Sequence, residues 1–395
     1  MKKSIYAIIA VVAVLLVSFM AMQHNGVVCA STNNSVGAKS YIVVDTNSSK
    51  ILYEYKPHEK MPVASICKLM TSLITLEKIE RNEISLDDKF VASDYCASVG
   101  GSSAFLDSGC EYTVRELLKS VIIASANDSA IVLAENIAGS EQNFVKLMND
   151  KAKELGMNDT LYANSTGLTE GEQYSTAYDI SLLIKEVGKH QIYLEDSHIW
   201  MDNLIHPSGR KTELVNTNRL IRYYPYCKTG KTGFTDEAGY CLSSIAEKDN
   251  MKLTCVVLGC ATPQDRFKDS IELYNTTFAN YKSIKVVDHN EPIDSKLKVA
   301  KGKNDYITVG YDEDVYVTMM SANTNDIEYK YEFNENLRAP LRTGDVVGKC
   351  YVIYQGDIVG SVNIITLESV DKLNYCDAIN KIINKFPINN VKGTK

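Results

Sequence analysis

Several familiar patterns are missing from this sequence, and each absence removes a class of function. None of its ten cysteines forms a Cys-x-x-Cys pair, which removes the usual structural zinc signature. The net charge is −7 and no dense basic run occurs, so we expect no nucleic-acid partner. The six histidines are scattered and no Gly-x-Ser-x-Gly motif exists, which argues against a Ser-His-Asp hydrolase. A phosphate-binding loop at Gly230-Lys231-Thr232 is also excluded, because Pro225 stands where that motif needs a glycine.

What is present is the composition of a folded protein with more than one domain. The 395 residues are 45% hydrophobic and 23% charged, and this length suggests two or three domains. Cys67, Cys241 and Cys255 lie in apolar stretches and are expected to be buried. Cys96 and Cys110 flank a Gly/Ser loop and could form a disulfide, which the sequence does not decide.

Residues 1–30 have the three-part plan of a secretory signal peptide. Two lysines precede an uncharged stretch at 5–22, and small residues at 28–30 offer a cleavage site. The apolar stretch is long for a signal peptide, so an uncleaved membrane anchor is the alternative. Either way, we expect the functional part to be exported, at the outer face of the cell membrane or in the cell wall.

Hydrophobic patterning predicts an α+β fold for residues 31–283. Strands are predicted at 41–45, 51–55, 226–233, 238–246 and 253–258. The first two should form a hairpin. Residues 113–190 form an α-rich block with helical periodicity, and a further helix is predicted at 265–281. We therefore expect an antiparallel sheet with helices on its face and an inserted helical block.

The remainder of the chain has a different character. Residues 284–370 alternate strand-like runs with turn signals and predict a small all-β C-terminal domain. In residues 371–395 the apolar side chains fall on one helical face. Such a tail suits contact with a membrane surface and suits packing against the β domain about equally well.

A serine and a lysine stand three residues apart on a predicted buried helix. Pro62 and Ser65 predict its entry, since proline suits the first turn and serine commonly caps a helix. Three-residue spacing places Ser65 and Lys68 on one face. A serine hydroxyl needs a base, and a lysine amine can act as one when its pKa is lowered. Alone, the pair is also a common exposed polar pattern.

Two further motifs give this pair its meaning. Ser125-Ala126-Asn127 stands between two helical segments, and Lys231-Thr232-Gly233 lies on a predicted strand. Ser-x-x-Lys, Ser-x-Asn and Lys-Thr-Gly in this order are specific together. With these motifs, the chain resembles the low-molecular-mass, serine-type D-alanyl-D-alanine carboxypeptidases over about residues 38–370. The resemblance implies a β-lactamase/transpeptidase-like domain followed by a small β domain.

The resemblance also implies a role for each motif residue. Ser65 would attack the D-Ala-D-Ala end of a peptidoglycan pentapeptide, with Lys68 as its base and Ser125 as the proton relay. The substrate-binding residues would be Asn127, which would hold Lys68 and the substrate amide, together with Lys231, Thr232 and Phe234. β-Lactams would acylate the nucleophile as inhibitors. No metal or other cofactor is implied.

Two departures from the family pattern stand out. Lys-Thr-Gly occurs twice in tandem, and on a strand Lys228 and Lys231 point to opposite faces, so only one can face Ser65. We choose Lys231, because the residues after it have the family's spacing. Gln173 stands where the family often has a histidine, which leaves substrate preference at that loop open.

Two alternatives share the three motifs. A class A-like β-lactamase is disfavoured because no Glu-x-x-x-Asn loop follows the Ser-x-Asn motif and because a second domain is present. A penicillin or peptidoglycan sensor that acylates without turnover is the non-enzymatic alternative. The intact set of motifs favours the enzyme.

Overall fold

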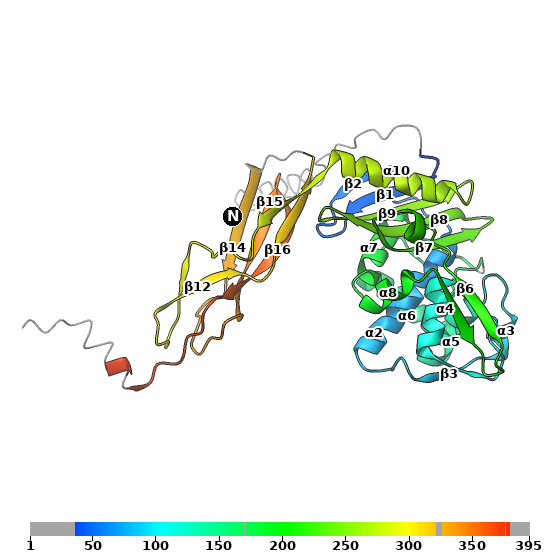
Figure 1. Cartoon of the computed structure of the whole chain (residues 1–395), viewed down its shortest axis with the longest axis horizontal. Coiled ribbons are helices and arrows are strands. Elements are labelled where there is room, and N and C mark those ends of the chain that lie inside the picture. Colours follow the sequence, from blue (N-terminus) through cyan, green and yellow to red (C-terminus); the bar gives the residue numbers. More distant parts are fainter. Residues whose placement is uncertain (1–35, 170, 321–325, 376, 380–395) are drawn as a thin grey trace, which may run out of the picture.

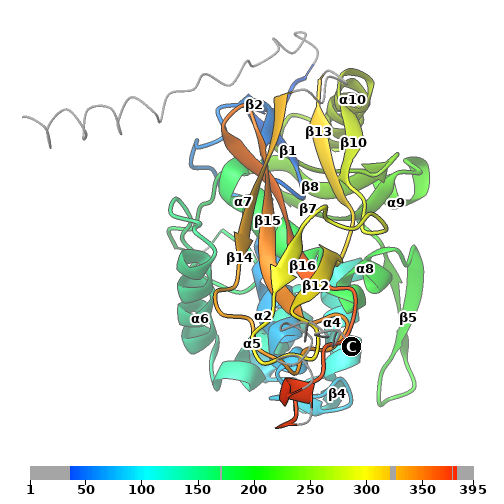
Figure 2. The ribbon, with the colours of Figure 1, turned by 90° about the vertical axis from the view of Figure 1, so that its left-hand side faces the viewer.

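The computed structural model describes residues 36–169, 171–320, 326–375 and 377–379, which form two units (Figure 1, Figure 2). The first unit is built on a five-stranded antiparallel sheet in the order β2-β1-β9-β8-β7. Its strands are β1 (Ser40–Asp45), β2 (Ile51–Tyr55), β7 (Cys227–Thr235), β8 (Gly239–Lys248) and β9 (Met251–Cys260). The five predicted strands and the β1–β2 hairpin are confirmed.

Both faces of this sheet are covered by helices, as Figure 1 shows. Side chains of β1 alternate between the two faces. Ile42 and Val44 join a buried cluster with α2 (Lys68–Glu80) and α7 (Ala177–Val187). Tyr41 and Val43 point the other way and pack with α10 (Asp265–Asn280). This burial on both faces explains why the central strands β1 and β9 contain continuous apolar runs.

The α-rich block is also confirmed. It contains α4 (Val114–Ile123), α5 (Asn127–Ala138), α6 (Glu141–Glu154), α7 and α8 (Gln191–Ser197). A capping box starts α4: the Thr113 hydroxyl accepts from the Glu116 backbone N–H, and the Glu116 carboxylate accepts from the Thr113 N–H. Helix α5 begins at the second functional motif, so the fold places that motif at a helix junction.

Short and exposed elements escaped the sequence analysis. A hairpin of β5 (Met201–Ile205) and β6 (Lys211–Val215) was not predicted, and Leu204 and Leu214 are the residues it buries. One buried side chain per strand leaves too little alternation to identify a strand. Also unpredicted were β3 (Lys89–Val91), α3 (Asp94–Ser98), β4 (Glu111–Thr113) and α9 (Leu220–Tyr223).

The second unit is all β, as predicted. A five-stranded sheet runs in the order β11-β12-β16-β15-β14, and β10 pairs with β13 beside it. The strands are β10 (Lys282–Val287), β11 (Lys296–Lys298), β12 (Tyr306–Tyr311), β13 (Val315–Met319), β14 (Ile327–Phe333), β15 (Val346–Tyr354) and β16 (Asp357–Thr366). Ile307, Val352 and Ile364 are fully buried members of its own core.

Some predictions concern residues outside this description. The predicted signal segment and most of the predicted amphipathic tail lie outside the described residues. Within the described part, no helix is long and apolar enough to cross a membrane. The eight cysteines described there are free thiols, so the possible Cys96–Cys110 disulfide is not formed.

Candidate active site

Ser65 lies on a short turn that leads into the buried helix α2. The turn is a 3-10 helix, η1 (Ala64–Cys67), and α2 starts at Lys68. The prediction that Ser65 caps the helix is wrong, because neither helix has a side-chain cap. Its hydroxyl accepts a hydrogen bond from Lys68 Nζ at 2.9 Å. Ala64 holds φ at +50°, a conformation that costs on the order of 1 kcal/mol and is common at functional sites.

Lys68 is a buried amine without a carboxylate partner among the described residues. Its Nζ donates to Ser65 Oγ and, at 2.6 Å, to the carbonyl oxygen of Thr166. Burial lowers the Lys68 pKa to about 7, because the charged form loses its hydration; the charge of Asp128 opposes this shift. At neutral pH a large fraction of Lys68 is therefore an uncharged amine that can accept a proton.

Strand β7 packs directly against η1, and a glycine permits this contact. A Cβ on Gly233 would lie 2.6 Å from the Val63 carbonyl oxygen and 3.3 Å from Ala64 Cβ. No larger residue fits there without moving the turn. The glycine of Lys-Thr-Gly thus brings the strand next to the nucleophile.

Lys231 reaches from β7 to the second serine motif. It is 1% exposed, and its Nζ donates to Ser125 Oγ at 2.7 Å. Burial lowers its pKa well below the ordinary lysine value, and the neighbouring Lys68 and Arg266 lower it further. Ser125 sits between α4 and α5 with φ at +62°, a second strained residue of the site.

Lys228 has a different environment. It lies at a β-bulge of β7, is partly exposed, and pairs with Glu247 at 3.8 Å. Of the two tandem lysines, Lys231 is the one whose amine contacts a residue of the other motifs.

Two further predicted substrate-binding residues extend along β7. Thr232 is 4% exposed and donates to the Thr217 hydroxyl at 2.7 Å. Phe234 is 47% exposed, and its ring stacks on Tyr240 with centroids 4.2 Å apart. Thr217 was not proposed as a site residue, although the Asn216-Thr217-Asn218 stretch carried part of the resemblance.

Asn127 does not make the contact predicted for it. Its Nδ2 donates to the Gly100 carbonyl at 2.7 Å, and no hydrogen bond joins it to Lys68 among the described residues. Its Oδ1 is buried and has no partner within the described chain. The Thr166 carbonyl makes the contact with Lys68 that was expected of Asn127, because it accepts a hydrogen bond from Lys68 Nζ.

The loop that carries Thr166 is the main part of the site that the sequence analysis missed. Gly167 has φ +82°, and a Cβ there would lie 2.0 Å from the Ala64 carbonyl oxygen. Glu141 anchors the loop by accepting from the Ser165 backbone and hydroxyl at 2.9 and 2.6 Å. The polar run Asn164-Ser165-Thr166-Gly167 was readable as a turn, but nothing in it pointed to Lys68.

Cys67 directs its thiol toward the loop that carries Thr166, where its partners are Asn164 and Gln173. It is buried, and its Sγ donates to the Asn164 carbonyl at 3.4 Å and lies 3.7 Å from Gln173 Oε1. Burial raises its pKa to about 12, so this thiol is not a nucleophile at neutral pH. Gln173 also accepts from the Ala163 N–H at 3.2 Å, which ties its side chain to the same loop.

Ser65 is hydrogen-bonded to the buried Lys68, and Ser125 is hydrogen-bonded to the buried Lys231. Because the Lys68 pKa is about 7, this amine can activate the Ser65 hydroxyl without a histidine. Fold and site together define a serine hydrolase of the penicillin-binding class. The chain belongs to the peptidase S11 family of D-alanyl-D-alanine carboxypeptidases, which matches residues 27–262. The C-terminal domain of penicillin-binding protein 5 matches residues 281–372.

Individual relatives agree with this assignment. The D-alanyl-D-alanine carboxypeptidase DacF of Bacillus subtilis is 36% identical over 339 residues, covering 86% of this chain and 87% of the relative. The carboxypeptidase DacC of Escherichia coli is 32% identical over 346 residues, covering 86% and 85%. Among solved structures, a peptidoglycan synthesis regulatory factor (PBP3) of Streptococcus pneumoniae matches with a TM-score of 0.75 at 28% identity, covering 85% of this chain and 100% of that one.

These comparisons support the carboxypeptidase interpretation rather than its two alternatives. The two relatives from Bacillus subtilis and Escherichia coli are both named as carboxypeptidases, and each aligns with 86% of this chain. The second family match covers the second unit of the chain. The β-lactamase/transpeptidase-like fold of the first unit is shared with this class.

Proposed function

We propose that this protein removes the terminal D-alanine from peptidoglycan stem pentapeptides through a Ser65 acyl-enzyme. The observation that carries the proposal is the contact of 2.9 Å between Ser65 Oγ and an amine whose pKa is about 7. At neutral pH a large fraction of Lys68 is uncharged and can accept the Ser65 proton. Among the described residues, no carboxylate forms an ion pair with Lys68 that would keep it charged.

In the first step, Ser65 Oγ attacks the carbonyl between the two D-alanines while Lys68 takes its proton. The backbone N–H groups of Ser65 and Phe234 stabilise the oxygen that becomes negative. Each such donor contributes about 3 kcal/mol of transition-state stabilisation in comparable enzymes. Positioning by η1 and β7 supports this assignment, because the two backbones lie in contact at Gly233.

In the second step, the proton that Lys68 took from Ser65 passes through the Ser125 hydroxyl to the leaving amine of D-alanine. Lys231 Nζ donates a hydrogen bond to Ser125 Oγ and so holds the relay in position. Lys231 and Thr232 bind the terminal carboxylate of the substrate. That carboxylate restores the charge of Lys231, because an adjacent anion raises a lysine pKa that burial has lowered.

Asn127 takes part through its unpaired oxygen. The buried Oδ1 has no partner among the described residues, and the amide N–H of the substrate supplies one. Water then hydrolyses the acyl-enzyme. A β-lactam follows the same acylation path and remains on Ser65, and the reaction takes place outside the cytoplasm, where peptidoglycan is exposed.

The test is D-alanine release from a peptide that ends in D-Ala-D-Ala, measured beside labelling by a fluorescent penicillin. Ser65→Ala should abolish both signals. Ser295→Ala, an exposed serine of the second unit, is the matched control and should leave both unchanged. Labelling that survives Ser65→Ala contradicts the assignment of the nucleophile, and labelling without D-alanine release in the wild type would favour the sensor.

A further inference from the structure

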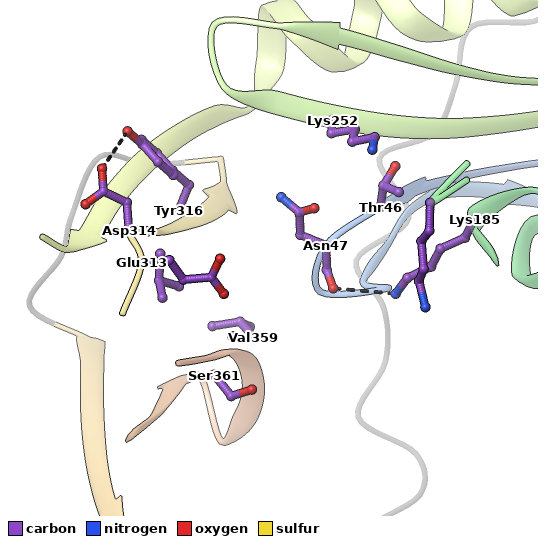
Figure 3. Close-up of a pocket in the computed structure, with 12 residues that line it drawn as sticks. Thr46, Asn47, Lys185, Lys252, Glu313, Asp314, Tyr316, Val359 and Ser361 are labelled. Carbon is purple, nitrogen blue, oxygen red and sulfur yellow. Dashed lines mark hydrogen bonds between the residues drawn. The ribbon is translucent and has the colours of Figure 1, made fainter. Parts of the chain in front are cut away.

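A polar cavity of about 510 Å³ lies where the two units meet (Figure 3), and Ser65 is not among the residues that line it. One wall comes from the β1–β2 turn, α7 and β9, and the other from the second unit around β13 and β16. The units are fastened beside it: Thr318 donates to buried Asp45 at 2.6 Å, and Lys50 lies over the Tyr354 ring at 4.9 Å. The cavity is therefore framed by specific contacts.

The wall from the first unit is cationic. Lys185 lines it from α7, Lys189 from the turn after α7, and Lys252 from β9. Lys189 is paired with Glu186 at 2.6 Å. Lys185 contacts only neutral oxygens of the β1–β2 turn, and no described carboxylate pairs with Lys185 or Lys252. Burial lowers the pKa of Lys185 and the charge of Lys189 lowers it further, while the more distant carboxylates of Asp45 and Glu186 oppose the shift without forming an ion pair with Lys185.

The opposite wall is acidic. Asp314 is already neutralised, because Lys285 and His289 contact its carboxylate at 2.7 and 2.8 Å. Asp288, His289 and Asp314 could together hold a metal ion, but the Lys285 amine already lies against both carboxylates. Glu313 is different: it is exposed, it lines the cavity, and it has no ion pair within the described chain.

Lys185 and Lys252, which have no ion pair among the described residues, thus line the same cavity as Glu313, which has none there either. A simple anion would satisfy Lys185 and Lys252 but would be repelled by Glu313. A ligand with two carboxylates and one amine matches all three groups. Polar side chains such as Asn47 and Ser361 complete the lining and suit a hydrated peptide.

We propose that this cavity is a second, non-catalytic binding site for a short peptide with two carboxylates and one amine. That charge pattern belongs to the uncrosslinked peptidoglycan stem peptide, so this identification of the source rests on the proposed function. Binding here would hold the enzyme on peptide-rich wall while the separate groove at β7 carries out hydrolysis.

The probe is the tripeptide N-acetyl-L-Ala-γ-D-Glu-L-Lys, which has two carboxylates and one amine and lacks the D-Ala-D-Ala end. Its binding to the full chain is measured by calorimetry after the active site has been acylated with penicillin and the acylation confirmed by mass. We expect saturable binding. Lys252→Gln should weaken it about fivefold, the upper range for one partly exposed ion pair. Lys268→Gln, an exposed lysine of α10 outside the cavity, is the charge-matched control and should not change it.

The amine is tested with a second peptide whose lysine side chain is acetylated. Acetylation should weaken binding of the peptide to the wild type about fivefold. It should not change binding to the Glu313→Gln variant, because that variant already lacks the ion pair between the peptide amine and Glu313. The idea is overturned if no saturable binding occurs, if Lys268→Gln weakens it equally, or if inorganic phosphate competes as well as the peptide. D-alanine release by the same variants should stay at the wild-type level. If the wild type binds the peptide but releases no D-alanine, the proposed function is contradicted while the proposed binding site is not.

Discussion

The Lys68 pKa of about 7 makes the pH dependence of acylation a direct test of the proposed mechanism. Only the neutral amine can accept the Ser65 proton. A group of pKa 7 is neutral in about one-tenth of molecules at pH 6 and in about nine-tenths at pH 8. The second-order rate of penicillin acylation should therefore rise about tenfold between these two values.

A substitution strengthens the same test. Lys68→Arg keeps a cation beside Ser65, but a guanidinium of pKa above 12 is never neutral near pH 7. The loss should equal that of a missing general base, about 10²–10⁴ in rate. Lys78→Arg on the same helix is the matched control, because its amine pairs with Glu83 at the surface rather than with Ser65. It should keep the wild-type rate and pH profile.

The assay is stopped-flow acylation by a fluorescent penicillin from pH 5.5 to 9, with unfolding monitored so that denaturation is not read as titration. A flat profile between pH 6 and 8 would refute the reasoning, as would a rate that falls with rising pH. A Lys68→Arg enzyme with near-wild-type acylation would show that another group removes the Ser65 proton.

Three further outcomes are expected. Lys231→Ala should lower D-alanine release by at least about 10² because it removes the buried partner of the proton relay, whereas Lys228→Ala should keep most activity; steady-state kinetics on both variants checks this. Gly167→Ala should destabilise the fold by about 2 kcal/mol or more and abolish penicillin labelling, because its Cβ would overlap the Ala64 carbonyl at a left-handed φ; thermal unfolding and gel labelling measure both. A substrate whose terminal carboxylate is replaced by an amide should lose kcat/KM with the wild type and lose much less with Lys231→Ala, and equal losses in both would contradict carboxylate binding by this lysine.

The sequence predicted those parts of the site that sit on regular elements. Helical periodicity after Ser65 identified α2, which buries a long apolar run. Strand β7 was predicted although most of its residues are polar or glycine. The family's spacing after the second Lys-Thr-Gly then selected Lys231 over Lys228, and the fold brings the Lys231 amine to Ser125. The three motifs lie far apart in the sequence, and only their resemblance to a known family indicated that they come together in one site.

What escaped prediction depends on backbone groups and on tertiary contacts without a sequence signature. The second partner of Lys68 is the backbone carbonyl of Thr166. Because every residue has a backbone carbonyl, the sequence gives no sign of which one will accept this hydrogen bond. The Asn127 contact failed for a related reason, since an amide can bond to whichever loop lies nearest, here Gly100. The β5–β6 hairpin was missed because it buries too few side chains to show a period.

The two buried lysines lie close enough for the charge of Lys68 to affect the Lys231 pKa. Each cation would make the other costlier to charge, and the Lys231 pKa falls partly because of Lys68. In the proposed mechanism, a substrate carboxylate that binds beside Lys231 and Thr232 would stabilise the proton on Lys231. In this mechanism the carboxylate compensates the charge restored on Lys231, so the pair adds little net field at Lys68. Binding of the correct end group would thus charge Lys231 while burial keeps the base next to Ser65 largely neutral, so that one site both recognises the terminal carboxylate and holds an uncharged lysine.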